Sequence, residues 1–382
     1  MPGPIPFHRP SITQAEIDAV TAVLRSGWLT TGPKARELEA AVIKYVGGGD
    51  LRAVCLSSCT AALHLALIAA GVGSGDEVVT SPYTFVSTGE TILYLGAKPV
   101  FVDVEASTRN LDPGKLTAAL TKKTKAIVSI SIAGHPCRAA EIAAIARDRK
   151  IPVIEDAAHS LTARIGETPV GTQADITCFS FYATKGVTSG EGGLAVTARR
   201  EWADRIRRLS LHGLSDGAWS RYDKGGWWEY DVTELGYKYN LTDIQAALAL
   251  AQLTRAEEMR SRRETIARRY EEGLRGLPGL RTPTAAPGIR HAWHLYQIAI
   301  GPGGRVDRDA LTLALREDGI GTSVHFKPLH LFPFYQRELG VREGQLPVAE
   351  GCYREALSLP IFPDLSGSDQ DRIIGRIRHH LG

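Results

Sequence analysis

The chain contains the short apolar run Ala126-Ile127-Val128-Ser129-Ile130-Ser131 and, after a helical pattern over 139–150, a second run, Pro152-Val153-Ile154. Strands that are buried on both faces of a sheet read as continuous apolar runs rather than as an alternation of apolar and polar residues. A helical segment between two such strands is typical of a right-handed crossover between parallel neighbours. This stretch therefore predicts a β-α-β unit, and with it an α/β fold.

The same alternation of apolar runs and helical patterns extends from about residue 50 to residue 200. The further expected elements are strands at Ala53–Leu56, Glu77–Thr80, Pro99–Val102 and Asp175–Phe181, and helices at Thr60–Ala70 and Ser87–Leu95. We expect a large domain with a mostly parallel sheet and helices around it.

The pattern changes in the last third of the chain. A long helical pattern covers residues 240–275, and a strand over 293–300 and a helix over 308–317 follow it. At 382 residues the chain exceeds the usual size of one hydrophobic core. We therefore predict a large domain over residues 1–255 and a smaller α+β domain over residues 256–382.

Composition limits the class of protein. The 45 basic and 42 acidic residues nearly balance, so the net charge of +3 gives no reason to expect binding to nucleic acid or to membranes. No apolar run reaches the ~18 residues of a membrane span, and the N-terminus lacks the pattern of a signal peptide. The 5 cysteines have no metal-ligand spacing and are odd in number, which favours free thiols in a reducing compartment. We expect a soluble cytoplasmic protein without a metal site.

Lys185 is the first candidate functional residue. It follows a run of strand-forming residues, 175–181, and precedes the glycine-rich turn Ser189-Gly190-Glu191-Gly192-Gly193. A lysine at the mouth of a buried strand is costly unless its amine is paired or used. The best-known use of such an amine is a Schiff base, and pyridoxal 5'-phosphate (PLP) is the commonest partner. Most lysines are solvated surface residues, so Lys185 alone decides nothing.

Two other segments stand where strands are expected to end, which is where ligands of open α/β sheets bind. Two acids, Glu155 and Asp156, come directly after the run 152–154, and the carboxylate of Asp156 can hold a pyridine nitrogen protonated. The run 56–63 passes from a strand through Ser57 and Ser58 into a helix, whose N-terminus suits a phosphate. Taken singly, Asp156 is also explained as a helix cap, and an ordinary Ser/Thr cap is the favoured interpretation of Ser58. Together with Lys185, they supply a phosphate anchor, a pyridinium partner and an imine-forming amine.

The chain also resembles the DegT/StrS-type sugar aminotransferases, PLP enzymes of fold type I, over nearly its whole length. Within that family it is most similar to the branch that includes UDP-4-amino-4-deoxy-L-arabinose aminotransferase. The matching segments are 27–33, 75–78, 84–88, 155–159, 191–193, 236–247, 291–295 and 321–326.

The resemblance implies a role for each cofactor-binding residue. Lys185 is implied as the Schiff-base lysine and general acid/base, and Asp156 as the partner of the pyridine nitrogen. Phe85 is expected to stack on the ring, and His159 to lie near the ring hydroxyl. The phosphate is expected to bind Ser180 and the amides of Cys59 and Thr60.

The resemblance also implies a homodimer with shared sites. Lys238 and Asn240 are expected to reach the phosphate of the neighbouring subunit, and many relatives have asparagine and arginine at these two positions. Their segment leads into a helix of its own, and we expect no strand end beside it. Thr30 and His325 are the expected substrate contacts.

The function implied is transfer of an amino group from L-glutamate to a nucleotide-linked keto-sugar, with 2-oxoglutarate as the other product. The amino sugar would serve a cell-surface glycan, lipid A or a natural product. The alternatives are a PLP-binding regulator without turnover, a dehydrase with histidine in place of Lys185, an amino-acid aminotransferase and a C3-specific enzyme. His8, His64 and His135 are interpreted as structural or surface histidines, and Trp227-Trp228 as either a sugar-stacking platform or loop packing.

Overall fold

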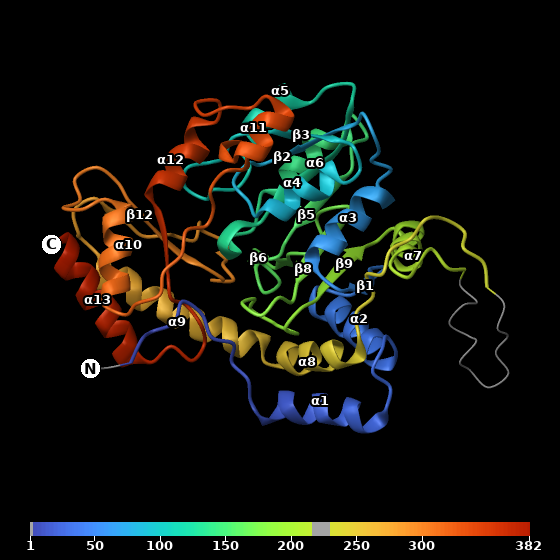
Figure 1. The fold of residues 1–382 in the computed structure, drawn as a ribbon, viewed down its shortest axis with the longest axis horizontal. Coiled ribbons are helices and arrows are strands. Elements are labelled where there is room, and N and C mark those ends of the chain that lie inside the picture. Colours follow the sequence, from blue (N-terminus) through green and yellow to red (C-terminus); the bar gives the residue numbers. More distant parts are fainter. Residues whose placement is uncertain (1–2, 216–229) are drawn as a thin grey trace.

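The computed structural model of the chain describes residues 3–215 and 230–382 (Figure 1). Its centre is a seven-stranded sheet in the order β1-β9-β8-β5-β4-β2-β3. Neighbours from β8 to β3 are parallel, whereas β9 is antiparallel to both β1 and β8. The predicted α/β fold with a mostly parallel sheet is confirmed. The strands are β1 (Arg52–Leu56), β2 (Glu77–Thr80), β3 (Lys98–Phe101), β4 (Thr124–Ile130), β5 (Val153–Asp156), β8 (Ile176–Ser180) and β9 (Gly193–Thr197).

Helices cover both faces of this sheet. They are α1 (Gln14–Ser26), α2 (Pro33–Tyr45), α3 (Cys59–Ala69), α4 (Val86–Leu93), α5 (Pro113–Ala119), α6 (Ala139–Arg147), α7 (Arg200–Leu209) and α8 (Asp243–Thr254). Val54 of β1 packs in a core cluster with residues of α3 and α7, whereas its neighbour Cys55 packs with residues of α2 and α8. Because successive strand residues point to opposite faces, the two clusters lie on the two sides of the sheet, as the continuous apolar runs predicted.

The C-terminal part of the chain builds a second core. Its main elements are α9 (Ala256–Leu274), β10 (Leu280–Arg281), β12 (Tyr296–Ile300), α10 (Arg308–Glu317), β13 (Ala356–Leu359) and α13 (Gly367–Leu381). Strand β12 is the centre of the antiparallel sheet β10-β12-β13, and Ile298 on it packs in one cluster with Ile373 of α13. Ile5, from the other end of the chain, belongs to this cluster too. Division of the chain at residue 255 stays a prediction.

The remaining elements are short. They are β6 (Arg164–Ile165), β7 (Thr168–Pro169), β11 (Ile289–Arg290), α11 (Pro333–Leu339) and α12 (Pro347–Glu355), with 3-10 turns at Ile132–Gly134 and Leu329–Leu331. The long helical pattern predicted over 240–275 is two helices, α8 and α9, separated at Arg255. The strand predicted from Trp293 begins only at Tyr296, because Trp293 has a left-handed backbone with φ 52°. Within the described ranges, no helix combines the length and apolarity that a membrane span requires.

Candidate active site

A cavity of about 610 Å³ opens at the carboxyl ends of the parallel strands. Asp156 stands at the end of β5 and Ser180 at the end of β8, while Ser58 follows the end of β1. Residues from the C-terminal part, including His294 and His325, complete the wall. The cavity brings together eight predicted site residues from distant parts of the chain: Cys59, Thr60, Phe85, Asp156, His159, Ser180, Lys185 and His325.

The amine of Lys185 has no carboxylate within ion-pair distance among the residues that the structure describes. Removal from water lowers the pKa of Lys185 from its ordinary value of 10.5 to about 8, although Cys59 and Asp156 act in the opposite direction. A lysine with such a pKa is partly uncharged near neutral pH, which a nucleophile or a proton carrier requires.

Asp156 is buried and its carboxylate is held from two sides. Thr88 donates a hydrogen bond from Oγ1 to Oδ2 at 2.9 Å, and the Ala158 amide donates to Oδ1 at 3.2 Å. Burial raises the pKa of Asp156, while Thr88, Ala158 and the charge of Lys185 counteract the increase. No cation within the described ranges forms an ion pair with Asp156, so the carboxylate can accept a protonated ring nitrogen.

Glu155, the other acid at the end of β5, faces away from the cavity. Its side chain lies on the other face of β5, where Ser131 donates to Oε1 at 2.6 Å and Thr177 to Oε2 at 3.5 Å. Burial raises the pKa of Glu155. Only Asp156 of the two lines the cavity.

His159 is an uncharged imidazole whose tautomer is fixed by the backbone. The Ala133 amide donates to Nδ1 at 3.2 Å, so the ring proton is on Nε2. Burial, aided by the charge of Lys185, lowers the pKa of His159 well below its usual range. The ring lies 6.0 Å from that of Phe326 and nearly parallel to it, at 13°. His159 can thus donate a hydrogen bond to a ring oxygen without carrying a charge.

The loop between β1 and α3 has the geometry of an anion site. Ser58 caps α3 by accepting a hydrogen bond from the Ala61 amide at 3.1 Å. The amides of Cys59 and Thr60 stand in the first helical turn, where no carbonyl of the same helix can accept from them. Gly193 lies so close that a Cβ there would be 2.2 Å from the carbonyl carbon of Ser58. The loop is therefore built against a glycine, with Ser180 on the same cavity wall.

The chain is similar in sequence and in structure to known proteins. The profile of the DegT/DnrJ/EryC1/StrS aminotransferase family covers residues 10–378. The chain belongs to this family. The spore coat polysaccharide biosynthesis protein SpsC of Bacillus subtilis is 46% identical over 98% of this chain and 96% of its own length.

Solved structures of family members superpose over nearly the whole chain. Spr1654 of Streptococcus pneumoniae, in its PLP form, has a TM-score of 0.91 at 34% identity and covers 98% of both chains. The sugar aminotransferase CalS13 of Micromonospora echinospora has a TM-score of 0.87 at 30% identity, over 98% of this chain and 99% of its own. The protein is a PLP-dependent aminotransferase that forms an amino sugar. The more specific assignment to the UDP-4-amino-4-deoxy-L-arabinose branch is not supported, because the similar proteins are other sugar aminotransferases.

The cavity of this family member fits PLP on three observations. Within the described part of the chain, the amine of Lys185 has no ion-pair partner and the buried carboxylate of Asp156 has no cation beside it. The loop at Ser58 presents helix-terminal amides beside Gly193. Phe85 precedes α4 at the cavity; the residue is 57% exposed, and its ring lies 6.2 Å from that of Phe326. Phe85 is thus free to cover a flat ring.

Three predicted site residues do not line the cavity of this chain: Thr30, Lys238 and Asn240. Asn240 instead donates from Nδ2 to Oγ1 of Thr31 at 2.7 Å, and its backbone bridges to Leu56 at the end of β1. The expectation that no strand end lies beside this segment is therefore wrong. The aromatic pair Trp227-Trp228 lies outside the described residues.

The sequence reasoning missed part of the wall. Phe7 and His8 from the N-terminal arm, together with His294, line the cavity. His8, interpreted from the sequence as a structural or surface histidine, stands in the cavity wall, whereas His64 and His135 are buried outside the cavity. No pattern in the sequence marks His8, since it stands between Pro6 and Pro10 in a segment without periodicity.

Proposed function

We propose that this family member transfers an amino group from L-glutamate to a nucleotide-linked keto-sugar, with the carbonyl at C4. The observation that carries the proposal is the placement of Lys185 and Asp156 on one cavity, each desolvated and without an ion-pair partner among the described residues. PLP bound there supplies the electron sink that makes the α-proton of the donor acidic.

Four residues of the chain then have separate roles in the reaction. Lys185 Nζ removes the proton from the α-carbon of glutamate, and in the return half-reaction it gives a proton to the sugar carbon. Asp156 keeps the pyridine nitrogen protonated by its negative charge, so its ionised form is the active one. His159, whose ring proton is on Nε2, would donate to the ring hydroxyl, and the exposed Phe85 would cover the ring.

The wall of the cavity offers uncharged hydrogen-bonding groups to a hydroxylated acceptor. Among the described lining residues the only cationic side chain is Lys185. The histidines His159, His294 and His325 have lowered pKa values, chiefly because of burial, to about 4 for His325. Uncharged imidazoles suit sugar hydroxyls.

A homodimer would complete the site. Lys238 is exposed and has no carboxylate partner within the described ranges, so its charge is available to a phosphate of the neighbouring subunit. We also place the enzyme in the cytoplasm, since all five cysteines are free thiols, four of them buried.

The proposal is tested by incubating holoenzyme with L-glutamate and a panel of nucleotide-linked 4-keto-sugars. One amino sugar should form for each 2-oxoglutarate released, with the new C–N bond at C4 by NMR, and Lys185→Ala should form none. A protein that binds PLP but consumes no glutamate would instead be a regulator. Amination at C3, or faster reaction with keto acids than with any keto-sugar, would also refute the proposal.

A further inference from the structure

The N-terminal arm, residues 3–11, is anchored to the C-terminal core by its first residues. The Ile5 amide donates to the Gly319 carbonyl at 2.8 Å, and the Gly321 amide donates back to the Ile5 carbonyl at the same distance. Arg372 adds a hydrogen bond from Nη1 to the carbonyl of Gly3 at 2.7 Å. A Cβ on Gly321 would be 2.6 Å from the amide nitrogen of Phe7, so the arm packs directly on this backbone.

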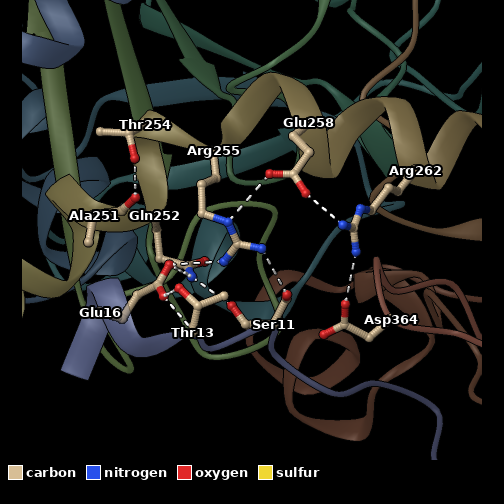
Figure 2. Close-up of polar contacts among 10 residues, drawn as sticks. All are labelled: Ser11, Thr13, Glu16, Ala251, Gln252, Thr254, Arg255, Glu258, Arg262 and Asp364. Carbon is tan, nitrogen blue, oxygen red and sulfur yellow. Dashed lines mark hydrogen bonds and ion pairs between the residues drawn. The ribbon is translucent and has the colours of Figure 1, made fainter. Parts of the chain in front are cut away.

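A second anchor holds the other end of the arm where α8 meets α9, as Figure 2 shows. Gln252 donates from Nε2 to the Ser11 carbonyl and to Oε1 of Glu16, both at 2.8 Å. Arg255 donates to Glu16 at 3.1 Å and to the Ser11 hydroxyl at 3.3 Å. Burial by itself would raise the pKa of Glu16, but hydrogen bonds from Thr13 and Arg255 hold it down at about 2. Glu16 is thus a permanent anion that fixes this end.

Between the two anchors, Phe7 and His8 of the arm line the cavity. The ring of Phe7 stacks on that of His325 at 5.5 Å and 26°. His8 lines the same wall, edge-on to Phe362 at 6.2 Å. The Nε2 atom of His8 is screened from bulk water and has no hydrogen-bond partner among the described residues. A buried polar atom without a partner is rare in a folded protein, and at a cavity wall a ligand can provide the partner.

His8 is also uncharged. Burial, together with the charges of Arg263 and Lys185, lowers its pKa to about 3, although a backbone hydrogen bond to Ala183 acts in the opposite direction. A neutral imidazole does not attract the carboxylates of glutamate. It does form hydrogen bonds with hydroxyl groups, which can both donate and accept.

We infer that His8 is a specificity-determining residue that hydrogen-bonds a hydroxyl group of the sugar ring through its unpaired Nε2, held in place by the doubly anchored arm. The inference rests on the proposed function, since it assigns one contact within the same substrate site. It separates the two substrates of the enzyme, because His8 serves the sugar and not the amino donor.

The test measures binding to holoenzyme by calorimetry, with UDP-glucose, dTDP-glucose, GDP-mannose and CDP-glucose as probes. Each is compared with its own nucleoside diphosphate, so that the contribution of the hexose is isolated. We expect the hexose to add affinity for at least one nucleotide. His8→Phe keeps a ring against Phe362 but removes the nitrogen, and should reduce that added affinity about three- to tenfold. His8→Gln, which restores a polar group, should recover part of it.

His135→Gln is the matched control, because Nε2 of His135 is likewise screened from water and without a hydrogen-bond partner among the described residues, but lies outside the cavity. It should leave both dissociation constants unchanged, and the glutamate half-reaction of His8→Phe should stay within about twofold of wild type. Three results would overturn the inference about His8 without touching the proposed function. They are an equal loss of affinity for the sugar nucleotide and for the diphosphate in His8→Phe, an unchanged hexose contribution in that variant, and no hexose contribution in wild type. If no sugar nucleotide or diphosphate binds wild type, the proposed function fails first.

Discussion

Thr88 donates the 2.9 Å hydrogen bond that fixes Oδ2 of Asp156, and a second hydroxyl stands behind it. Since the proton of Thr88 is directed to Asp156, the 2.9 Å contact between the hydroxyls of Thr84 and Thr88 has Thr84 as its donor. A relay of two threonines at the start of α4 therefore stabilises the ionised form of a buried carboxylate. Burial raises the pKa of Asp156, and the relay opposes that effect.

Thr88→Val should shift the acid side of the pH–activity profile to higher pH. The variant keeps the shape of the side chain but loses the hydrogen bond that favours the charged carboxylate, so the pKa of Asp156 rises and protonation inactivates the enzyme sooner as pH falls. A charge-assisted hydrogen bond of this kind is worth ~1.5 kcal/mol, so the acid limb of the glutamate half-reaction should move up by about one pH unit. Single-turnover absorbance measurements across pH give the profile.

Thr88→Ser is the control, because it keeps the hydroxyl and should keep the wild-type profile. Asp156→Asn should be slow at every pH, since its amide never ionises. A Thr88→Val enzyme with an unshifted acid limb would contradict the role given to the relay.

Lys185→Met should stabilise the apoenzyme at pH 7 and lose this advantage as the pH rises. The pKa of Lys185 is about 8 in the folded protein but 10.5 ordinarily, so the unfolded chain binds the proton more tightly. Folding therefore costs free energy below pH 8, and the cost disappears as pH rises from 8 to 10.5. Thermal unfolding should show a Tm gain of a few degrees at pH 7 and a much smaller one at pH 10.

Lys123→Met gives the baseline for a lysine without a cavity, because Lys123 is exposed. Its Tm difference from wild type should be the same at both pH values. If the Tm difference between Lys185→Met and wild type is also the same at pH 7 and pH 10, the amine is not desolvated in the way that the structure indicates.

Gly193→Ala should weaken PLP binding through the loop at Ser58. The added Cβ would lie 2.2 Å from the Ser58 carbonyl carbon and 2.4 Å from the Cys59 amide nitrogen, both of them backbone atoms that cannot rotate away. Overpacking of this kind costs ~1–3 kcal/mol, and we expect a PLP affinity reduced about tenfold by absorbance titration. Gly375→Ala in α13 meets no atom within 4 Å and should stabilise the helix by ~0.5–1 kcal/mol, with PLP affinity unchanged. Wild-type affinity in Gly193→Ala would refute the anion site.

The parts of this site that follow strands could be predicted from the sequence. Asp156 stands two residues after the run 152–154 and Lys185 four residues after the run 175–181. Because parallel strands bring their carboxyl ends to one edge of a sheet, these local patterns together indicated a shared site. The same logic placed Ser180 and the loop at Cys59 on the cavity.

Long-range contacts could not be predicted in this way. His8 reaches the cavity because Ile5 pairs with residue 320, which lies more than three hundred positions along the chain. Nothing in a proline-flanked segment encodes that partner. Asn240 shows the same limit, since its bridge to Leu56 joins the end of β1 to the residues before α8 and contradicts the isolated segment that was expected. The period of the hydrophobic pattern predicts helices and strands, but it does not predict which irregular segments pair with one another.

Lys238 and Asn240 differ in a way that bears on the second subunit. The Asn240 amide is engaged with Thr31 in its own chain, whereas Lys238 is exposed and makes no ion pair within the described ranges. Of the two, Lys238 is thus the better candidate for the partner's phosphate, and Lys238→Met should lower PLP affinity more than Asn240→Ala does. A free ammonium can neutralise a phosphate as a point charge.

Mixing two inactive variants tests whether sites are shared. One protomer carries Lys185→Ala, and the other carries changes at both Lys238 and Asn240. In the heterodimer one site would hold both lesions and the other site neither, so about half of the wild-type activity per heterodimer should return. Each variant must be inactive alone, and tagged subunits must be shown to exchange. If heterodimers form without recovered activity, each site is built from a single chain, and a monomer by sedimentation at working concentration would lead to the same conclusion.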